Sequence, residues 1–458
     1  MKEHSATKRV GRDLTQGPIL PALLSFAVPI VLTNLIQQLY SMVDLMVIGK
    51  FVGSIGTVGV STGGEISDLM TPIAGALAAA GQIYIAQLAG AKMTDDIKRV
   101  IGTLLTMMII VSVIVTAGVC IFYKPILGWL NCPEEAFAAA SHYMLITVIG
   151  LPFIFGYNAV CAVLRGMGES KRPLIFIIVA AVVNIFLDLL LVIAFDMQET
   201  GTAIATVASQ IGAFAAAFIY MYKRKEQLGF RLERSYFKID RHDLGIILKL
   251  GIPQLIRTLS VNGSMLWVKA NVNAYGMVAS ATYSVGNKVE KFMNMFINGI
   301  DVAGGAMIGQ NIGARQHERV RKIIRNMLLI SLVMALVVGA LFLTLPDFFY
   351  SLFTDDAAVI EFGRVFLRIM SVGCIVVGFS GAMKSIVTGA GAALLSLIIG
   401  ILDGVMRILI CLLFFYVFHQ EVQSYFWGAA FCQLVPGIVC LVYYLSGKWK
   451  TKKLLSES

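Results

Sequence analysis

The sequence predicts an all-α membrane protein with twelve transmembrane helices, arranged as two six-helix lobes related by an internal duplication. Composition is the first observation, because 58% of the residues are hydrophobic, 14% are charged and the mean hydropathy is +0.81. A water-soluble core of this size cannot hide so much apolar surface. The second observation is a series of apolar runs of about 20 residues, the length that spans a bilayer as a helix. The third is that the chain resembles itself at a shift of about 223 residues.

The duplication is clearest at one polar junction in each half. Ala86–Val100 reads AQLAGAKMTDDIKRV and Gly309–Ile323 reads GQNIGARQHERVRKI, so both contain Gln-x-x-Gly-Ala followed by a basic residue. The same shift places Arg165–Gly168 on Thr388–Gly391. A repeat of nearly half the chain is too long for a solenoid unit and is typical of transporters with two parallel halves.

The helices follow from the apolar runs in chain order. Runs such as 107–119 and 327–345 are apolar on nearly every face, whereas barrel strands alternate apolar and polar residues over short lengths. Six helices fall in each half. The predicted segments are 18–46, 56–88, 98–122, 135–163, 173–195, 201–222, 246–272, 278–309, 322–346, 358–386, 392–418 and 424–446.

Domain organisation follows from the only long polar connector, 223–242. We predict an N-terminal lobe at 1–222, a cytoplasmic linker at 223–245 and a C-terminal lobe at 246–458. The two lobes would meet at this linker.

The net charge of +10 follows membrane topology. Of the 37 Lys and Arg residues, 28 lie on one predicted side, in the tails, in the loops after helices 2, 4, 6 and 8, and at Lys384. The opposite loops contain Lys50 and Lys124. Positive residues concentrate in cytoplasmic loops. We therefore expect a multi-pass protein of the cell membrane with both termini in the cytoplasm and no nucleic-acid partner.

Residue types that hold metals or cofactors are scattered. The seven cysteines lie mainly in apolar segments, and the five histidines lie in tails, loops and helix ends. We therefore predict no cofactor and no metal centre apart from a coupling ion. The sequence contains no P-loop motif for ATP binding, so energy for transport is expected from an ion gradient.

Two carboxylates in the first half carry the strongest functional signal. Asp44 lies in the first predicted helix, and Asp188 lies in the fifth, four residues after Asn184. A charged residue inside a bilayer costs roughly 2.5 to 3.5 kcal/mol on insertion scales, so it normally faces a bundle interior or water. Two carboxylates in a low dielectric resist simultaneous ionisation, so one would hold a proton or a cation. The alternative is that both aspartates only join helices through hydrogen bonds. Asp44 belongs to a polar stripe on one helix face, formed by Asn34, Gln37, Ser41 and Asp44.

The second half has polar stripes of its own. They indicate either the walls of a hydrated cavity or structural ion pairs such as Lys269 with Glu290, and both alternatives stay open. Asp403 and Arg407 are four residues apart and favour a local salt bridge. The shift of 223 places Asn184 and Asp188 on Arg407 and Cys411, so only the first half has the carboxylate pair. The stripes contain Thr258, Asn262, Met265 and Lys269 in helix 7, and Asn287, Glu290, Asn294, Asn298 and Asp301 in helix 8.

Four segments together resemble one transporter family. They are VPIVLTNLIQQLYSMVDLMVIGKFVG, LRGMGESKRP, VVNIFLDLLLVIAF and GTAIATVASQ. Together they are similar to the multidrug and toxic compound extrusion (MATE) transporters, and the pattern of Asp44 with Asn184-x-x-x-Asp188 is similar to the DinF-like branch of that family, which includes MepA-type exporters. The resemblance covers nearly the whole chain and implies a V-shaped antiporter that is not an enzyme. Such an antiporter alternates between inward-open and outward-open states and expels amphipathic organic cations in exchange for protons or sodium ions.

The resemblance also implies residue roles. Carried over to this sequence, the coupling cation, H⁺ or Na⁺, would bind at Asp44 and Asp188, with Tyr40 lining the same chamber. Another branch of the family has carboxylates in helices 7 and 10, where this chain offers Lys269 and basic residues, so a sodium site in the second lobe is not expected there. Glu290 and Asp301 could replace it. The remaining residues of the implied cation site are Asn184, Thr206 and Asn158.

Two other functions stay open at this point. A flippase for a lipid-linked sugar would share the superfamily architecture, although such proteins resemble fourteen-helix chains with a strongly cationic cavity. An intramembrane protease could use paired aspartates as an acid and base, but no other catalytic motif accompanies them. The expected partners are small organic cations and the lipid bilayer, and the expected state is a monomer.

Overall fold

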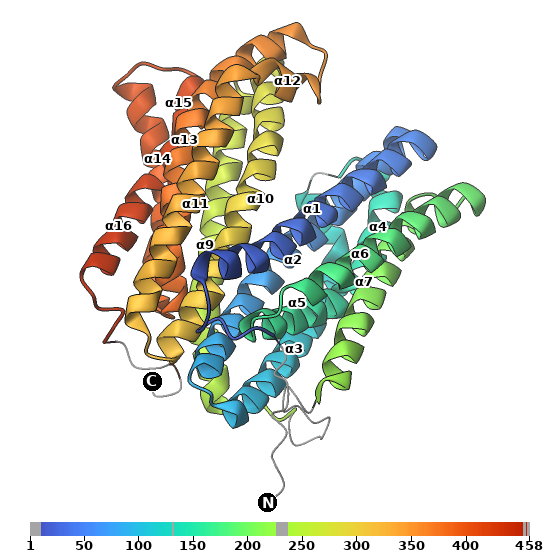
Figure 1. Cartoon of the computed structure of the whole chain (residues 1–458). Helices are drawn as coiled ribbons and strands as arrows, with labels where there is room; N and C mark the ends of the chain where they lie inside the picture. Colours follow the sequence, from blue (N-terminus) through green and yellow to red (C-terminus); the bar gives the residue numbers. More distant parts are fainter. Residues whose placement is uncertain (1–10, 131, 226–236, 452–454, 456–458) are drawn as a thin grey trace, which may run out of the picture. The chain divides into compact units, whose positions relative to one another are not determined.

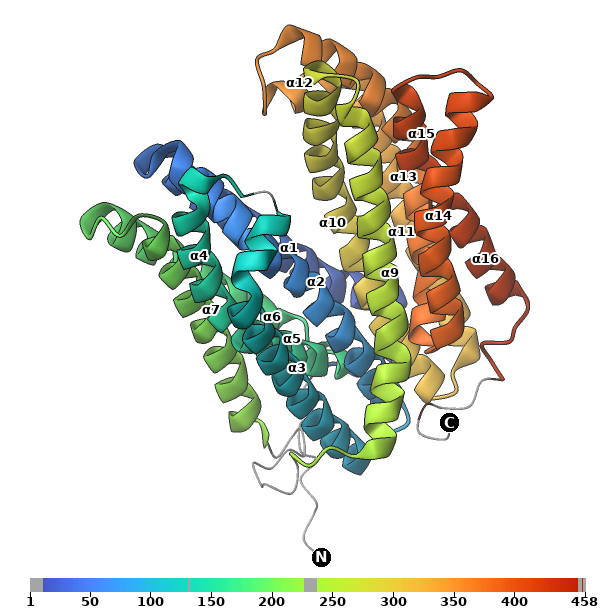
Figure 2. The same cartoon turned by 180° about the vertical axis from the view of Figure 1, so that it is seen from behind.

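The computed structural model describes residues 11–130, 132–225, 237–451 and 455, and every regular element within them is helical (Figures 1 and 2). The predicted fold class, an all-α membrane protein, is therefore confirmed. The N-terminal tail, residues 226–236 of the predicted linker and most of the C-terminal tail lie outside the described residues.

The first half of the chain forms its six predicted spans. Its helices are α1 (Ile19–Phe51), α2 (Gly53–Gly90), α3 (Thr94–Trp129), η1 (Glu134–Ala136), α4 (Phe137–Ile149), α5 (Leu151–Gly166), α6 (Lys171–Asp188), η2 (Leu189–Ala194) and α7 (Gln198–Lys223). Two of these spans each consist of two consecutive helical elements, α4 with α5 and α6 with η2. α4 and α5 replace one predicted helix and meet at a bend of 41°. Pro152 lies in the first turn of α5 and removes a backbone donor at the bend.

The second half repeats this pattern. It contains α9 (Arg241–Asn273), α10 (Met277–Gly313), α11 (His317–Thr344), α12 (Pro346–Ser351), α13 (Ala357–Gly389), α14 (Ala393–Tyr416), α15 (Gln423–Phe431) and α16 (Leu434–Leu445). α10, α11 and α13 run side by side in both views (Figures 1 and 2). The boundaries of the predicted spans differ by a few residues from the ends of these helices. The helices are longer, because their polar ends continue past the apolar runs.

Ten helices in the described part of the chain are long and apolar enough to cross a membrane, or eleven if the bent pair α4 and α5 is one span. α10 is not among them, although it is 37 residues long and covers the predicted eighth span. Its sequence includes Lys288, Glu290, Lys291 and Asp301. This polarity separates α10 from the other helices and makes it a candidate for a buried or water-facing role.

The backbone shows the duplication directly. Three pairs of residues with positive φ are separated by the same 223 positions as the repeated motifs. Such left-handed residues commonly end helices, because they let the next N–H groups bond back to the last carbonyls. The pairs are Lys92 (60°) with Arg315 (56°), Gly168 (86°) with Gly391 (63°), and Asp196 (51°) with His419 (51°).

The chain folds into two compact units, and α1 and α9 contribute to both. The first unit contains Leu32–Gly251, and the second contains Leu14–Val31 together with the chain from Ile252 onward. The start of α1 therefore packs in the core of the second unit, where Leu23, Phe26 and Ile30 are buried in the same cluster as residues of α10 and α11. Conversely, the start of α9 belongs to the first unit.

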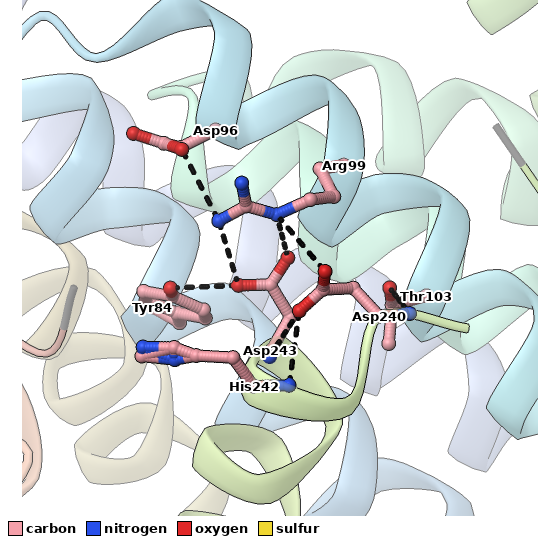
Figure 3. Close-up of polar contacts among 7 residues, drawn as sticks. All are labelled: Tyr84, Asp96, Arg99, Thr103, Asp240, His242 and Asp243. Atoms are coloured by element: carbon pink, nitrogen blue, oxygen red, sulfur yellow. Dashed lines mark hydrogen bonds and ion pairs between the residues drawn. The ribbon is translucent and has the colours of Figure 1, made fainter. Parts of the chain in front are cut away.

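A cluster of polar contacts fixes the start of α9 in the first unit (Figure 3). The carboxylate of Asp243 is fully buried and accepts hydrogen bonds from Arg99 Nε at 2.6 Å and Nη2 at 3.3 Å. It also accepts one from the hydroxyl of Tyr84 at 2.9 Å. Because α3 supplies Arg99 and α2 supplies Tyr84, three helices meet at one buried charge.

Asp240 caps the same helix. Its Oδ1 accepts hydrogen bonds from the backbone N–H groups of His242 and Asp243, each at 3.0 Å, as an N-cap residue does (Figure 3). The N–H of Asp243 and then the nearby Arg99 guanidinium hold the pKa of the Asp240 carboxyl below its usual value. The ionised form of Asp240 therefore stabilises the start of α9.

Candidate functional site

The structure brings Asp44 and Asp188 together in the first unit. Asp44 is 8% exposed in α1, and Asp188 is fully buried at the end of α6. The two carboxyl groups interact directly with each other. Within the described residues, however, Oδ1 of Asp44 and both oxygens of Asp188 make no hydrogen bond of good geometry. A buried carboxyl with unsatisfied oxygens is expensive unless it binds a proton, a cation or water.

The local backbone helps to explain the position of Asp188. α6 ends at this residue and continues as the π-helical turn η2, Leu189–Ala194. Such turns are often found at functional sites. Asn184, one turn before Asp188, is 1% exposed, and its side-chain oxygen and nitrogen both lack a partner in the described structure. The end of α6 therefore presents two polar side chains, Asn184 and Asp188, whose bonding capacity is unused among the described residues.

Helices α4 and α7 complete this site with hydroxyl groups. Thr202 of α7 is fully buried beside Asp188. Tyr143 of α4 lies beside Thr206 and within electrostatic range of both aspartates. Gln210 Nε2 donates to the hydroxyl of Tyr40 at 3.5 Å, and Tyr40 is in turn an electrostatic neighbour of Asp44.

One predicted member of the cation site, Asn158, and one predicted cavity-lining residue, Gln37, are not joined to the aspartate pair by any contact seen in the described residues. Asn158 donates from Nδ2 to the carbonyl of Ile154 at 2.9 Å, within its own helix α5. Gln37 is half-buried on α1, one turn before Tyr40. The side chain of Ser41, part of the predicted stripe, lies outside what the structure describes.

Sequence reasoning missed several polar residues around the pair. Tyr143, Thr202 and Gln210 lie in otherwise apolar or small-residue segments, so no spacing rule selected them. Glu65 and Asp68 are exposed acidic residues within the apolar span Val58–Gly90 of α2. Since each would cost roughly 2.5 to 3.5 kcal/mol facing lipid at the centre of a helix, this cost could have singled them out.

In the second unit, Glu290 lies beside a small cavity of about 20 Å³, enough for about one water molecule. Its Oε1 accepts a hydrogen bond from Asn294 at 3.2 Å, and its Oε2 is buried without a partner in the described structure. A bridge from Glu290 to Lys269, one of the two alternatives for this stripe, is not seen among the described residues, in which Lys269 is exposed on α9. Asn287, one turn before Glu290, also has a buried oxygen without a partner among the described residues.

Another ion pair in this unit differs from the prediction. Asp403 pairs with Lys384 of α13, with Nζ at 2.8 Å and 3.1 Å from its two oxygens, and Gln433 completes the group at 3.1 Å. The predicted local salt bridge between Asp403 and Arg407 is therefore wrong. Lys384 is buried, so it does not belong with the charges of the cytoplasmic loops and tails.

The remaining predicted positions of the second unit have separate places. Asn262 is half-buried on α9. Asp301 lies on α10 beside Ser385 and within electrostatic range of Lys384, and its Oδ1 is buried without a hydrogen bond among the described residues. The described residues contain no group of three or more His, Cys, Asp and Glu side chains placed to hold a metal ion.

Comparison with known proteins identifies the family. The MatE family model matches residues 29–190 and 253–413. The probable multidrug resistance protein YoeA of Bacillus subtilis is 28% identical over 404 residues, which cover 87% of each chain. The multidrug export protein MepA of Staphylococcus aureus is 22% identical over 390 residues, or 84% of this chain and 86% of MepA.

A solved structure has the same fold. It is an outward-facing conformation of a multidrug resistance MATE family transporter of the MOP superfamily, and it matches 98% of this chain and 99% of its own with a TM-score of 0.89 at 21% identity. The family match takes one segment from each repeat and covers more than half of the chain. The protein is therefore a membrane transporter and not an enzyme, and it belongs to the MATE family of multidrug efflux transporters.

Proposed function

We propose that the protein is a secondary active exporter of the plasma membrane, which exchanges protons or sodium ions for amphipathic organic cations by alternating access. The observation that carries this proposal is the buried pair Asp44 and Asp188, with three carboxylate oxygens that lack hydrogen bonds in the described structure. A pair of this kind binds a proton readily, because two carboxylates in a low dielectric resist ionising together. A sodium ion would instead use oxygen ligands, which hard cations prefer.

Each of the two possible coupling ions has residues that could bind it. Protonation needs only the two carboxyl groups. Sodium binding would add Asn184, Thr202 and Thr206, whose side-chain oxygens are buried and have no partner of good geometry among the described residues. In both cases Tyr40 lines the chamber, and release of the ion leaves two carboxylates that repel each other until the next ion or substrate cation arrives.

The relatives support small drug-like molecules as the substrates, and their cationic character is part of our proposal. YoeA and MepA are described as multidrug resistance and multidrug export proteins. None of the relatives and structures compared above supports the flippase alternative. The distribution of Lys and Arg supports an orientation with both termini in the cytoplasm, and we propose that a single chain is the working unit.

Transport in proteoliposomes tests the proposal. A fluorescent organic cation is loaded, and its efflux is followed under an imposed pH gradient and, separately, under a sodium gradient. We expect one gradient to drive efflux by the wild type and neither to drive it in Asp188→Asn. Asp196→Asn is the matched control, because the same change is made eight residues later at an exposed position whose φ of 51° Asn tolerates. Absence of gradient-driven efflux by the wild type would overturn the proposal.

A further inference from the structure

The aspartate pair is buried, so a proton that binds there needs a route from water. Asp44 is 8% exposed and Asp188 is fully buried. Asp68 of α2 is an exposed carboxylate in the same unit, within the span Val58–Gly90. An acidic side chain in a membrane helix faces water or a protein interior in preference to lipid. Asp68 therefore marks a part of the surface of the first unit that we expect to face water.

Tyr143 lies between this face of α2 and the aspartate pair. α2 packs on α4, and the Cε1 atom of the Tyr143 ring lies 3.5 Å from the position that a Cβ on Gly64 would occupy. Asp68 follows Gly64 by one helical turn and shares its face of α2. The Tyr143 hydroxyl is beside Thr206 and within electrostatic range of Asp44, Asp68 and Asp188.

Tyr40 makes a second link between the same groups. It lies one turn before Asp44 on α1 and is an electrostatic neighbour of both Asp44 and Asp68. Gln210 of α7 donates a hydrogen bond to its hydroxyl at 3.5 Å, which leaves the O–H of Tyr40 able to donate elsewhere. The tyrosines of α1 and α4 are therefore each near the exposed carboxylate of Asp68 and near Asp44 of the buried pair.

The buried end of this route has unused bonding capacity. Oδ1 of Asp44 and both oxygens of Asp188 are shielded from water and have no hydrogen-bond partner of good geometry within the described residues. Asp188 is more than nine-tenths buried, as is Asp44. These oxygens can accept a proton. The described titratable groups near them are Tyr40, which is near Asp44, and Tyr143, which is near both aspartates, and Asp68 is near the same two tyrosines.

We propose that Asp68 is the water-facing end of a proton path that runs through the hydroxyls of Tyr143 and Tyr40 to Asp44 and Asp188. This inference rests on the proposed function in its proton-coupled form. The carboxylate of Asp68 takes a proton from water. A tyrosine hydroxyl then donates its own proton to Asp44 and receives the proton of Asp68, directly or through a water molecule. One proton moves, and Asp68 and the tyrosine return to their starting forms.

The experiment compares Asp68→Asn, Tyr143→Phe and the control Glu65→Gln in proteoliposomes. Glu65 is an exposed acid on the same helix, one turn before Asp68. We expect Asp68→Asn to slow efflux driven by a pH gradient by about tenfold or more, as loss of a proton-transfer group does. Affinity for the fluorescent cation and dye exchange without a gradient should stay within about twofold. Glu65→Gln should behave as the wild type.

Tyr143→Phe, one further variant, Asp68→Glu, and a chemical rescue distinguish a path from a structural role. Tyr143→Phe should slow pH-driven efflux in the same way, and Asp68→Glu should restore most of the rate. Added imidazole, a small mobile proton carrier, should partly rescue Asp68→Asn.

Each opposite result has a distinct meaning. Wild-type rates in Asp68→Asn would overturn the path and leave the proposed function standing. Loss of dye affinity in Asp68→Asn would also overturn it, because Asp68 would then bind substrate. If the wild type responds to sodium but not to a pH gradient, the path is excluded and sodium exchange remains. If it responds to neither gradient, both proposals fall.

Discussion

Replacing Arg99 with Ala should destabilise the first unit, because it leaves the buried carboxylate of Asp243 with one neutral partner. In the intact protein Asp243 is fully buried and accepts two hydrogen bonds from Arg99 and one from Tyr84. After the change only the Tyr84 bond remains. The carboxylate must then draw water into the site or take up a proton.

The size of the effect depends on how deeply Arg99 and Asp243 are each buried. Breaking a buried ion pair typically costs about 3 to 5 kcal/mol. The Arg99 side chain is 45% exposed, so water can partly replace it, and the geometry of its second bond, at 3.3 Å, is weaker. We therefore expect a loss of about 2 to 3 kcal/mol. For a unit of this size, that corresponds to a fall in melting temperature of roughly 4 to 12 °C.

Thermal unfolding of the purified protein in detergent, followed by size-exclusion chromatography or intrinsic fluorescence, measures this fall. Arg321→Ala is the matched control. Arg321 pairs with Glu318 at 2.8 Å and is about as exposed as Arg99, but Glu318 is 76% exposed whereas Asp243 is buried, so the expected loss is roughly 0.5 kcal/mol or less. The double variant Arg99→Ala with Asp243→Asn should be less destabilised than the sum of its single changes. Equal melting temperatures for Arg99→Ala and the control would refute this reasoning.

Three further predictions concern stability. Because the pKa of Asp240 is lowered in the fold, its contribution is present above the unfolded value of about 3.9 and is lost as pH falls through the folded value. The melting temperature of Asp240→Asn should therefore fall less than that of the wild type between pH 5 and pH 3, and an equal fall would contradict the assignment. Asp403→Asn leaves the buried ammonium of Lys384 without a counter-charge and should cost about 3 to 5 kcal/mol in the same unfolding assay, whereas Asp196→Asn should cost little. Gly168→Ala should cost about 1 to 3 kcal/mol, because φ is 86° and the new Cβ would meet the carbonyl oxygen of Arg12. Gly212→Ala, in open space on α7, should be neutral or slightly stabilising. Similar melting temperatures for the two glycine variants would contradict the strain expected from a side chain at position 168.

Apolar length predicted the helices well, because a run of about 20 apolar residues has few alternatives to a spanning helix. The bend between α4 and α5 was not predicted, although Pro152 is a visible cause. The division of α1 and α9 between the two units could not be read from the sequence, because it depends on packing between distant segments. The 223-residue repeat does not reveal this division either, because the repeat shows which residues of the two halves correspond and not which residues pack together.

The candidate site shows the same limit. Helical spacing and the cost of membrane charges selected Asp44 and Asp188, and the structure places them together. Spacing alone paired Asp403 with Arg407, but the partner is Lys384, which the chain brings from another helix. Tyr143 escaped notice because an aromatic residue in an apolar helix carries no signal until its neighbours are known.

The division of α1 has a consequence for how the chain is assembled during synthesis. Leu14–Val31 is made before the rest of the second unit, yet it completes a core whose other members include Met327 of α11 and Cys440 of α16, which are made much later. Leu14–Val31 therefore lacks its packing partners while most of the protein is translated. Two fragments cut at the sequence boundary between the repeats would therefore not correspond to two folding units, since the second fragment would lack Leu23, Phe26 and Ile30 from its core.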